Sequence, residues 1–435
     1  MTRDLEIRSA RDAAFLALLA WGPLSAITYP FLRLGEPAWV TFDRVWIGAI
    51  GIWVLYDLIT RRDRPRSRAA DLVAAAALLF VVTFGLRAAL TPEDRLTVIK
   101  IWFDAVVLPV VLLLAARQLI GSMRDFRLLF GALAMTGALL SLIGLAEFAF
   151  GFELATRSGG TPFYDRNIDL VRVSGPYAST ETYALSLLIC FAATLCSLRL
   201  RGDGVLSVAA AVAALELAAI GITFFRTAWL AALVIIVFIF GLPLVRARPR
   251  PAVIVALVLG LAVVAFGLIQ SDAVSTRLSD SDNAAGRLAT WGQDLKVFGT
   301  APVFGVGVER FTSATTDETN VVVSGVYALD NPHNSYLALL AEQGIVGFIP
   351  FALLTVVVWR LIRAVRKAAS TQEVRYVALC LTGAGIAYLI TSLTLTMLPS
   401  APSNALMGLL VGAAAGLLDR VGTTRDTARI VNVAG

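Results

Sequence analysis

The 435-residue chain is far too apolar for an ordinary soluble globular protein. Hydrophobic residues make up 58% of it, charged residues only 16%, and the mean hydropathy is +0.78. The formal net charge of +6 is therefore interpreted by the location of the basic residues, and not as a nucleic-acid-binding surface. We expect an all-α integral membrane protein that forms one polytopic domain over residues 1–435.

Apolar segments of membrane-spanning length recur along the whole chain. A helix needs roughly 20 apolar residues to cross the hydrocarbon layer, and the sequence predicts about twelve such spans. In chain order they are residues 13–32, 43–60, 70–90, 97–116, 127–150, 177–198, 205–224, 227–245, 252–270, 334–362, 376–397 and 401–418. Arginines concentrate in every second connection, so the positive-inside rule predicts that both termini are cytoplasmic. The connections 151–176 and 271–333 then lie on the outer side of the membrane.

The long connection 271–333 is predicted to contain a helix at the membrane surface. Leu288, Trp291, Leu295 and Phe298 recur at helical spacing within residues 284–298, and Trp291 is of the type that anchors a helix at the interface. Arg287 lies near the start of this helix. A turn containing Gly305 and Gly307 follows and is expected to direct the chain toward the only histidine, His333.

His333 stands where the next helix is expected to begin. Asn331 suits the N-cap and Pro332 the first helical position, which would put His333 in the first turn. The helix N-terminus would hold the pKa of His333 down, favour the neutral form that a general base needs, and attract a phosphate. The alternative is that His333 only begins a helix at the membrane surface.

Two further arginines are predicted on the same side of the membrane. Arg226 lies where two spans meet with almost no connection, and there it needs a carboxylate, a carbonyl or an anionic ligand, unless it reaches lipid phosphate. Arg172 precedes the sixth span. Guanidinium groups bind phosphate in a bidentate manner, so Arg172, Arg226 and Arg287 suit a diphosphate. A base beside a diphosphate indicates glycosyl or phosphoryl transfer.

Other chemistries fit the sequence less well. The single histidine and three cysteines within spans leave no zinc site, and we expect no metal and no other cofactor. Asp280 and Asp282 have the chemistry to hold a divalent ion with a diphosphate, but such side chains are usually solvated. Lys100, Asp104, Glu147 and Glu216 fall in spans and would be compatible with an ion path in a transporter, although Lys100 and Asp104 are spaced to pair with each other.

The residues around His333 resemble a known signature. His333-Asn334, nine residues, Gly344, two residues and Gly347 are similar to the His-[Asn/Ser/Gln]-x9-Gly-x2-[Gly/Thr/Tyr] pattern of bacterial O-antigen ligases, which belong to a wider ligase and polymerase superfamily. Arg226 ahead of a span, Arg287 four residues before Trp291, the Gly305 turn and the single long periplasmic loop between spans 9 and 10 resemble the same family.

This resemblance implies a metal-independent, inverting glycosyltransferase in the inner membrane of a Gram-negative bacterium, with its active site at the periplasmic face. Such enzymes move a preassembled polysaccharide from undecaprenyl diphosphate to a sugar of the lipid A core. His333 would be the general base, and Arg226, Arg287 and Arg172 would bind the diphosphate, with Asn334 and Trp291 as further substrate-binding residues. The first five spans would serve as scaffold and lipid groove.

The implied partners are an undecaprenyl-diphosphate-linked glycan donor, a lipid A core acceptor and membrane lipids, with no nucleic acid. A polymerase that extends undecaprenyl-diphosphate-linked glycans remains an alternative, because it would use the same donor and similar residues. A twelve-span secondary transporter is a further alternative. It should show an inverted repeat and broken helices that meet in the middle of the membrane, whereas the polar clusters here lie at one surface.

Overall fold

The structure is a computed structural model that describes residues 2–29, 33–34, 40–60, 66–91, 95–151, 172–200, 206–241, 281–316, 319–328, 331–369, 371–396 and 398–433. Eight helices in these ranges are long and apolar enough to cross a membrane. Two small antiparallel hairpins accompany them, β1 (Arg33–Leu34) with β2 (Val40–Thr41) and β3 (Val322–Val323) with β4 (Val326–Tyr327). The prediction of an all-α membrane protein is therefore confirmed.

The helices follow one another with short connections through most of the described chain. The first half contains α1 (Thr2–Thr28), α2 (Phe42–Thr60), α3 (Arg68–Leu90), α4 (Arg95–Trp102), α5 (Leu108–Leu119) and α6 (Met123–Phe150). The second half contains α7 (Thr180–Leu200), α8 (Leu206–Ile222), α9 (Arg226–Ile236), α13 (Ser281–Thr300), α14 (Ser335–Ala368), α15 (Gln372–Ser392) and α16 (Ala401–Val433). The π-helical segment η1 (Phe103–Val107) joins α4 to α5, and a second π-helical segment, η2 (Val237–Gly241), extends α9. A 3-10 turn, η3 (Thr312–Ala314), follows α13.

A helix lies at every predicted span except the one at 252–270, which falls outside the described residues. The number of twelve spans therefore stays a prediction. The observed ends differ from the predicted ones because hydropathy detects only the apolar part of a helix, while backbone hydrogen bonds continue beyond it. Accordingly, α1 begins at Thr2 instead of residue 13, and α16 runs on to Val433.

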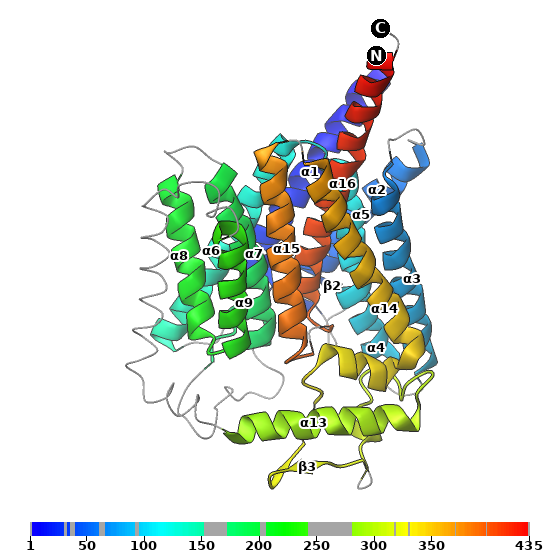
Figure 1. The fold of residues 1–435 in the computed structure, drawn as a ribbon, viewed down its shortest axis with the longest axis vertical. Helices are drawn as coiled ribbons and strands as arrows, with labels where there is room; N and C mark the ends of the chain where they lie inside the picture. The colour runs from blue at the N-terminus through cyan, green and yellow to red at the C-terminus, as the bar shows by residue number, and fades with distance from the viewer. Residues whose placement is uncertain are drawn as a thin grey trace.

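The spans run alongside one another, and α13 lies across one end of the bundle (Figure 1). The first residues of α1 and the last residues of α16 lie at the opposite end (Figure 1). The described part of the connection 271–333 thus forms a cap, which contains a 20-residue helix, η3 and the β3–β4 hairpin. The helix predicted over residues 284–298 is present, and its position at the membrane surface stays a prediction. A helix of this length and the hairpin were not predicted.

The helix at the centre of the bundle is α7, and protein surrounds it on all sides. Every side chain from Tyr183 to Leu198 is at most 5% exposed. A helix that is apolar all round can be buried in this way. Three polar side chains of α7 bind neighbouring helices: Tyr183 donates to Leu140 O on α6 at 2.9 Å, Ser186 contacts Ser403 on α16 at 3.0 Å, and Thr194 donates to Glu216 on α8 at 3.0 Å. These bonds fix α7 as a rigid scaffold.

A row of glycines brings α16 into backbone contact with α5. Gly408, Gly412 and Gly416 recur at every fourth residue and so share one face of α16. A Cβ atom at these positions would lie 2.4 Å from Pro109 O, 2.1 Å from Leu113 O and 2.2 Å from Ile120 O, respectively. The absence of side chains is therefore what lets the two helices approach so closely.

The buried acidic residues that suggested an ion path have protein partners. Asp104, on η1, accepts from Arg44 Nε at 2.6 Å and from a second Arg44 nitrogen at 2.8 Å. The pairing of Lys100 with Asp104 that the sequence spacing allowed is thus replaced by an ion pair between helices. Glu216 packs against Gly137, where a Cβ would lie 1.8 Å from its Oε1, and accepts from Thr194.

Candidate active site

The segment that contains His333 lies before a helix and not in it. The structure begins α14 at Ser335, and the N-cap is Asn334, whose side-chain oxygen accepts from Tyr336 N at 2.9 Å and Leu337 N at 3.2 Å. The prediction that Asn331 caps the helix and that His333 lies in its first turn is therefore wrong. Asn334 outcompetes Asn331 because its side chain binds two of the free N–H groups at the start of the helix.

Tertiary hydrogen bonds to the backbone also fix the position of His333. Thr396, which follows α15, donates its hydroxyl proton to Pro332 O. Ser335 Oγ donates to Leu395 O at 2.7 Å, and Trp291 Nε1 on α13 donates to His333 O at 3.4 Å. Residues from α13 and from the end of α15 thus hold the histidine between them.

The first glycine that follows His333 in the signature, Gly344, has a structural explanation in α14. Gly344 has φ of 63° and ψ of −166°, which are not helical, and it divides α14 into two helical pieces. A Cβ there would lie 2.4 Å from Val303 O. The turn predicted around Gly305 packs against this kink, since Val306 N donates to Ala341 O and Ile345 N donates to Pro302 O, at 2.9 and 3.0 Å. This turn serves packing, because Val306 N and Gly307 N donate to carbonyls of α14 and Gly305 N donates to Ala301 O.

The imidazole of His333 is half-buried and lies in a positive electrostatic environment. Burial lowers the pKa of His333 below its usual value, the charges of Arg287 and Arg172 lower it further, and Glu181 opposes them. Within the described part of the chain, the buried Nδ1 atom of His333 has no hydrogen-bond partner. The lowered pKa agrees with the expected direction, and its causes are burial and the charges of the arginines.

Arg172 is held between α7 and the turn that joins α8 to α9. One guanidinium nitrogen lies 3.5 Å from Glu181 Oε1, and Nε donates to Thr223 O at 3.4 Å. The chain just after Arg172 is anchored by Glu147 at the end of α6, which accepts from Ser174 N at 3.3 Å and from Gly175 N at 2.6 Å. Glu147 thus has a structural role, because it positions the segment that carries Arg172.

Arg226 is the first residue of α9 and is half-buried. A sharp turn precedes it, in which Phe224 adopts a φ of 50°, a conformation that bulky residues rarely adopt outside functional or strained sites. The next residue, Thr227, contacts Thr394 at 3.0 Å, two residues from the Thr396 that binds Pro332. No hydrogen bond or ion pair holds the Arg226 guanidinium within the residues that the structure describes. A cation at a helix N-terminus also opposes the helix dipole, so Arg226 is an uncompensated charge there.

Arg287 and Trp291 lie one turn apart on α13. Arg287 is half-buried and close enough to His333 for its charge to act on the imidazole. Of the predicted site residues, the structure therefore brings His333, Arg287, Trp291 and Arg172 together. It places Arg226 at the same end of the bundle. It uses the Asn334 side-chain oxygen as a helix cap, so a contact between Asn334 and substrate stays a prediction.

Sequence reasoning missed Glu181 and considered Glu147 only as part of an ion path. Glu181 has a detectable signal, namely a carboxylate in the first turn of an apolar span that begins on the same side as His333. The position of Glu147 within a span was visible in the sequence, but its role was not, because its backbone partners come from the next segment of the chain and not from its own helix.

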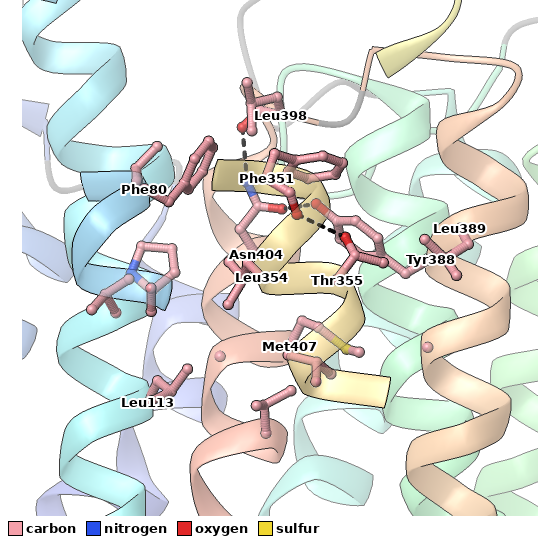
Figure 2. Close-up of a pocket in the computed structure, with 18 of the residues that line it drawn as sticks. Phe80, Leu113, Phe351, Leu354, Thr355, Tyr388, Leu389, Leu398, Asn404 and Met407 are labelled. Carbon is pink, nitrogen blue, oxygen red and sulfur yellow. Dashed lines mark hydrogen bonds between the residues drawn. The ribbon is translucent and has the colours of Figure 1, made fainter. Parts of the chain in front are cut away.

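An apolar cavity lies inside the bundle beside this site. It has a volume of about 160 Å³ and is lined by α3, η1, α5, α14, α15 and α16 (Figure 2). Phe351 and Leu389 line it, and both contact Tyr336, three residues after His333: the Tyr336 and Phe351 rings are 6.1 Å apart and Tyr336 Oη donates to Leu389 O at 3.1 Å. Tyr388 and Asn404, joined by a 2.6 Å hydrogen bond, form a polar edge (Figure 2).

The fold and the site define a multi-pass membrane protein with a histidine and several arginines gathered at one end of its bundle. Residues 209–352 match a family model described as O-antigen ligase. This segment includes Arg226, α13 and His333, so the similarity to that family covers the histidine and two of the arginines of the candidate site. No curated protein matches the chain.

Proposed function

We propose that the protein is an O-antigen ligase that transfers a preassembled polysaccharide from undecaprenyl diphosphate to a sugar of the lipid A core. The observation that carries this proposal is the half-buried His333, which lies in the segment that matches the family model and on which the charges of Arg287 and Arg172 act. The lowered pKa of His333 keeps its imidazole neutral at neutral pH, which is the form that accepts a proton.

The reaction then proceeds as a direct displacement. His333 takes the proton from the acceptor hydroxyl while the hydroxyl oxygen bonds to the anomeric carbon of the donor sugar. The bond from that carbon to the diphosphate oxygen breaks, the configuration inverts, and undecaprenyl diphosphate leaves with the electron pair. The proton passes from His333 to water afterwards. No metal ion is assigned a role, because the guanidinium groups offset the charge that develops on the leaving diphosphate.

The arginines divide this task according to their surroundings. Arg226 has no partner among the described residues, so its charge is available to a diphosphate. Arg287 acts on His333 from α13 and would place the diphosphate next to the base. Arg172 already has a carboxylate and a carbonyl as partners, so it would contribute charge with less freedom to move. Trp291 and Asn334 are proposed to complete the binding site.

The surrounding architecture supports lipid-linked substrates. The apolar cavity beside Tyr336 offers space for part of a hydrocarbon chain next to the polar site. By the positive-inside rule, the arginine-rich connections favour cytoplasmic termini, which would put the cap at the other end of the bundle in the periplasm. Lipid-linked donor and acceptor would meet there by lateral diffusion in the inner membrane.

The test is a transfer reaction with purified protein in detergent and EDTA. It contains undecaprenyl-diphosphate-linked glycan and lipid A core, and it compares the wild type with His333→Ala. Glycan that appears on the core lipid with the wild type alone supports the ligase and the role of His333. Glycan that lengthens on its own carrier identifies a polymerase. Undiminished transfer by a folded His333→Ala protein removes the general base, and no reaction with either substrate overturns the proposal.

A further inference from the structure

We infer that Glu181 is a positioning residue of the His333 site, which holds Arg172 in place and supplies the negative charge that offsets the arginines around the imidazole. The role of Glu181 in catalysis rests on the proposed function, whereas its contacts with Arg172 are independent of that function. Neither the signature around His333 nor the matched segment 209–352 includes Glu181.

The position of Glu181 is fixed by α7, the most deeply buried of the candidate spans in the described residues. Glu181 lies in the first turn of α7, where a carboxylate is favoured by the helix dipole. Ser179 Oγ accepts from Thr182 N at 3.1 Å and so caps this turn. Two residues after Glu181, the fully buried Tyr183 donates to Leu140 O at 2.9 Å. The backbone of Glu181 is therefore held by a helix and not by a loop.

The ion pair of Glu181 with Arg172 links three elements. The nearest oxygen and nitrogen are 3.5 Å apart, and the side chains are 25% and 11% exposed, so solvent screens this pair less than a fully exposed one. Arg172 Nε reaches Thr223 O in the turn before α9. Through Arg172, Glu181 therefore ties the start of α7 to the turn that presents Arg226.

The charges around His333 explain why a carboxylate is needed there. Arg287 acts on the imidazole from α13 and Arg172 from the segment before α7, and among the described charged groups that act on it, Glu181 is the acidic one. When His333 takes a proton from the acceptor, an imidazolium forms close to two guanidinium groups that disfavour it. Glu181 lowers the free energy of this charged form, and it acts through space and through the orientation of Arg172.

The substitution Glu181→Gln should therefore change His333 itself. Loss of the carboxylate removes the charge that favours the imidazolium, so the histidine should give up its proton at lower pH. An opposite charge within about 4–6 Å typically moves a pKa by about 1–3 units. Because Arg172 cancels part of that influence, we expect a shift of about half a unit or more toward lower pH.

The single histidine makes the measurement direct. Protein labelled with isotopes in histidine only, and purified through a histidine-free tag, gives one imidazole signal whose titration is followed by NMR in detergent. Glu181→Gln is compared with the wild type, with Glu181→Asp and with Glu373→Gln, whose carboxylate pairs with Arg127 on another part of the bundle. We expect a lower histidine pKa in Glu181→Gln, an intermediate one in Glu181→Asp and an unchanged one in Glu373→Gln.

An identical histidine pKa in the wild type, Glu181→Gln and Glu181→Asp overturns the inference, whatever the activity of the protein. If Glu181→Gln does not fold, as judged by thermal unfolding, the comparison with Glu181→Asp decides. The transfer assay adds an independent result: the acid limb of kcat/KM should move to lower pH together with the NMR titration. A wild type that transfers no glycan rejects the proposed function, while the NMR titration still decides the role of Glu181.

Discussion

At His333, burial and two arginine charges act in the same direction, since each disfavours the imidazolium. The imidazole is therefore neutral at neutral pH without help from a neighbouring hydrogen bond. A base of this kind has a lower proton affinity, and a larger fraction of it is in the neutral form that can accept a proton. The same arginines bind an anionic leaving group, so one set of charges serves the base and the substrate.

The charge of Arg287 and its shape should both matter. Replacing Arg287 with lysine keeps the charge but removes the planar fork that binds a diphosphate through two parallel hydrogen bonds. We expect kcat/KM for glycan transfer to fall roughly 10- to 100-fold, which corresponds to the loss of about one charge-assisted hydrogen bond. The matched control is Arg127→Lys, at a partly exposed ion pair with Glu373. Unchanged turnover in Arg287→Lys would leave Arg287 with an electrostatic role only.

Asp294 should make the attachment of the α13 cap depend on pH. Asp294 is fully buried, neither carboxyl oxygen has a partner among the described residues, and burial raises its pKa to about 8. In an opened cap the same carboxyl ionises near pH 4. The closed state then binds more protons between these values, so its stability falls as pH rises from about 4 to about 8 and levels off above.

Hydrogen exchange of α13 amides at pH 5 and pH 8 tests this expectation once corrected for the intrinsic rates. Protection of α13 should be lower at pH 8 in the wild type, and the difference between the two pH values should be smaller in Asp294→Asn, whose amide cannot ionise. The amides of α7 provide an internal reference, because that helix is buried in the bundle. Equal protection of wild-type α13 at both pH values would show that Asp294 is ionised within the cap.

At the scale of single elements, the kink of α14 joins the cap to the bundle. Gly344→Ala places a Cβ 2.4 Å from Val303 O and requires a φ of 63° from an L side chain. We expect the 302–307 turn to be displaced and transfer to fall at least tenfold, because that turn packs against the helix that follows His333. The assay is glycan transfer on protein of verified thermal stability.

The variant Gly325→Ala separates the effect of a steric clash from the effect of a positive φ. Gly325 also has a positive φ, 80°, but its Cβ would meet nothing within 4 Å. It therefore carries the backbone strain without the clash. If both variants lose activity equally, the close approach of Val303 is not the reason for glycine at 344.

The glycine row of α16 predicts that substitutions at the contact between α5 and α16 lower the stability of the protein. Gly412→Ala puts a methyl group 2.1 Å from Leu113 O, so α5 and α16 must separate. We expect a destabilisation of about 1–3 kcal/mol, measured as a lower midpoint of thermal unfolding in detergent. Gly48→Ala is the control, because a Cβ there meets no atom within 4 Å. An unfolding midpoint for Gly412→Ala equal to that of the control would contradict the proposed packing.

Local patterns predicted the helices well and their exact beginnings less well. The recurrence of Leu288, Trp291, Leu295 and Phe298 was sufficient for α13, because a surface helix depends mainly on its own periodicity. The start of α14 was misplaced by three residues, since Asn331-Pro332 and Asn334-Ser335 are both acceptable local signals. The choice between them depends on bonds to Thr396 and Leu395, which lie some sixty residues further along the chain.

In the candidate site, too, the sequence predicted the residue types but not the contacts between residues that are distant in the chain. The sequence identified His333 and three arginines by their chemistry and by their expected side of the membrane. It did not identify Glu181 or Glu147 as site residues, because their importance arises from contacts with Arg172 and with the backbone around Gly175. Residue types can be read locally, whereas the partners of a charge depend on the assembled bundle.

At the scale of the whole molecule, the cap and the termini lie at opposite ends of the bundle (Figure 1). Ser313 is exposed in η3, and Thr60 is exposed at the end of α2, while Cys190, Cys196 and Cys380 are buried. In intact cells, a membrane-impermeant thiol reagent should therefore label Ser313→Cys and not Thr60→Cys. Permeabilised cells should allow labelling of both, and the wild type should remain unlabelled. The reverse pattern would invert the predicted orientation.

The contact between α16 and α5 also bears on how the protein is made. Asp419, near the end of the apolar part of α16, accepts from Arg117 at 2.8 Å and from Ser67 N at 2.6 Å, and the glycine row lies against α5. The early spans emerge from the ribosome long before this partner exists. During synthesis, Arg117 and the backbone face of α5 therefore stay uncovered by α16 until α16 itself has been inserted. A chain cut short before α16 leaves this face of α5 exposed to the quality-control proteases of the membrane.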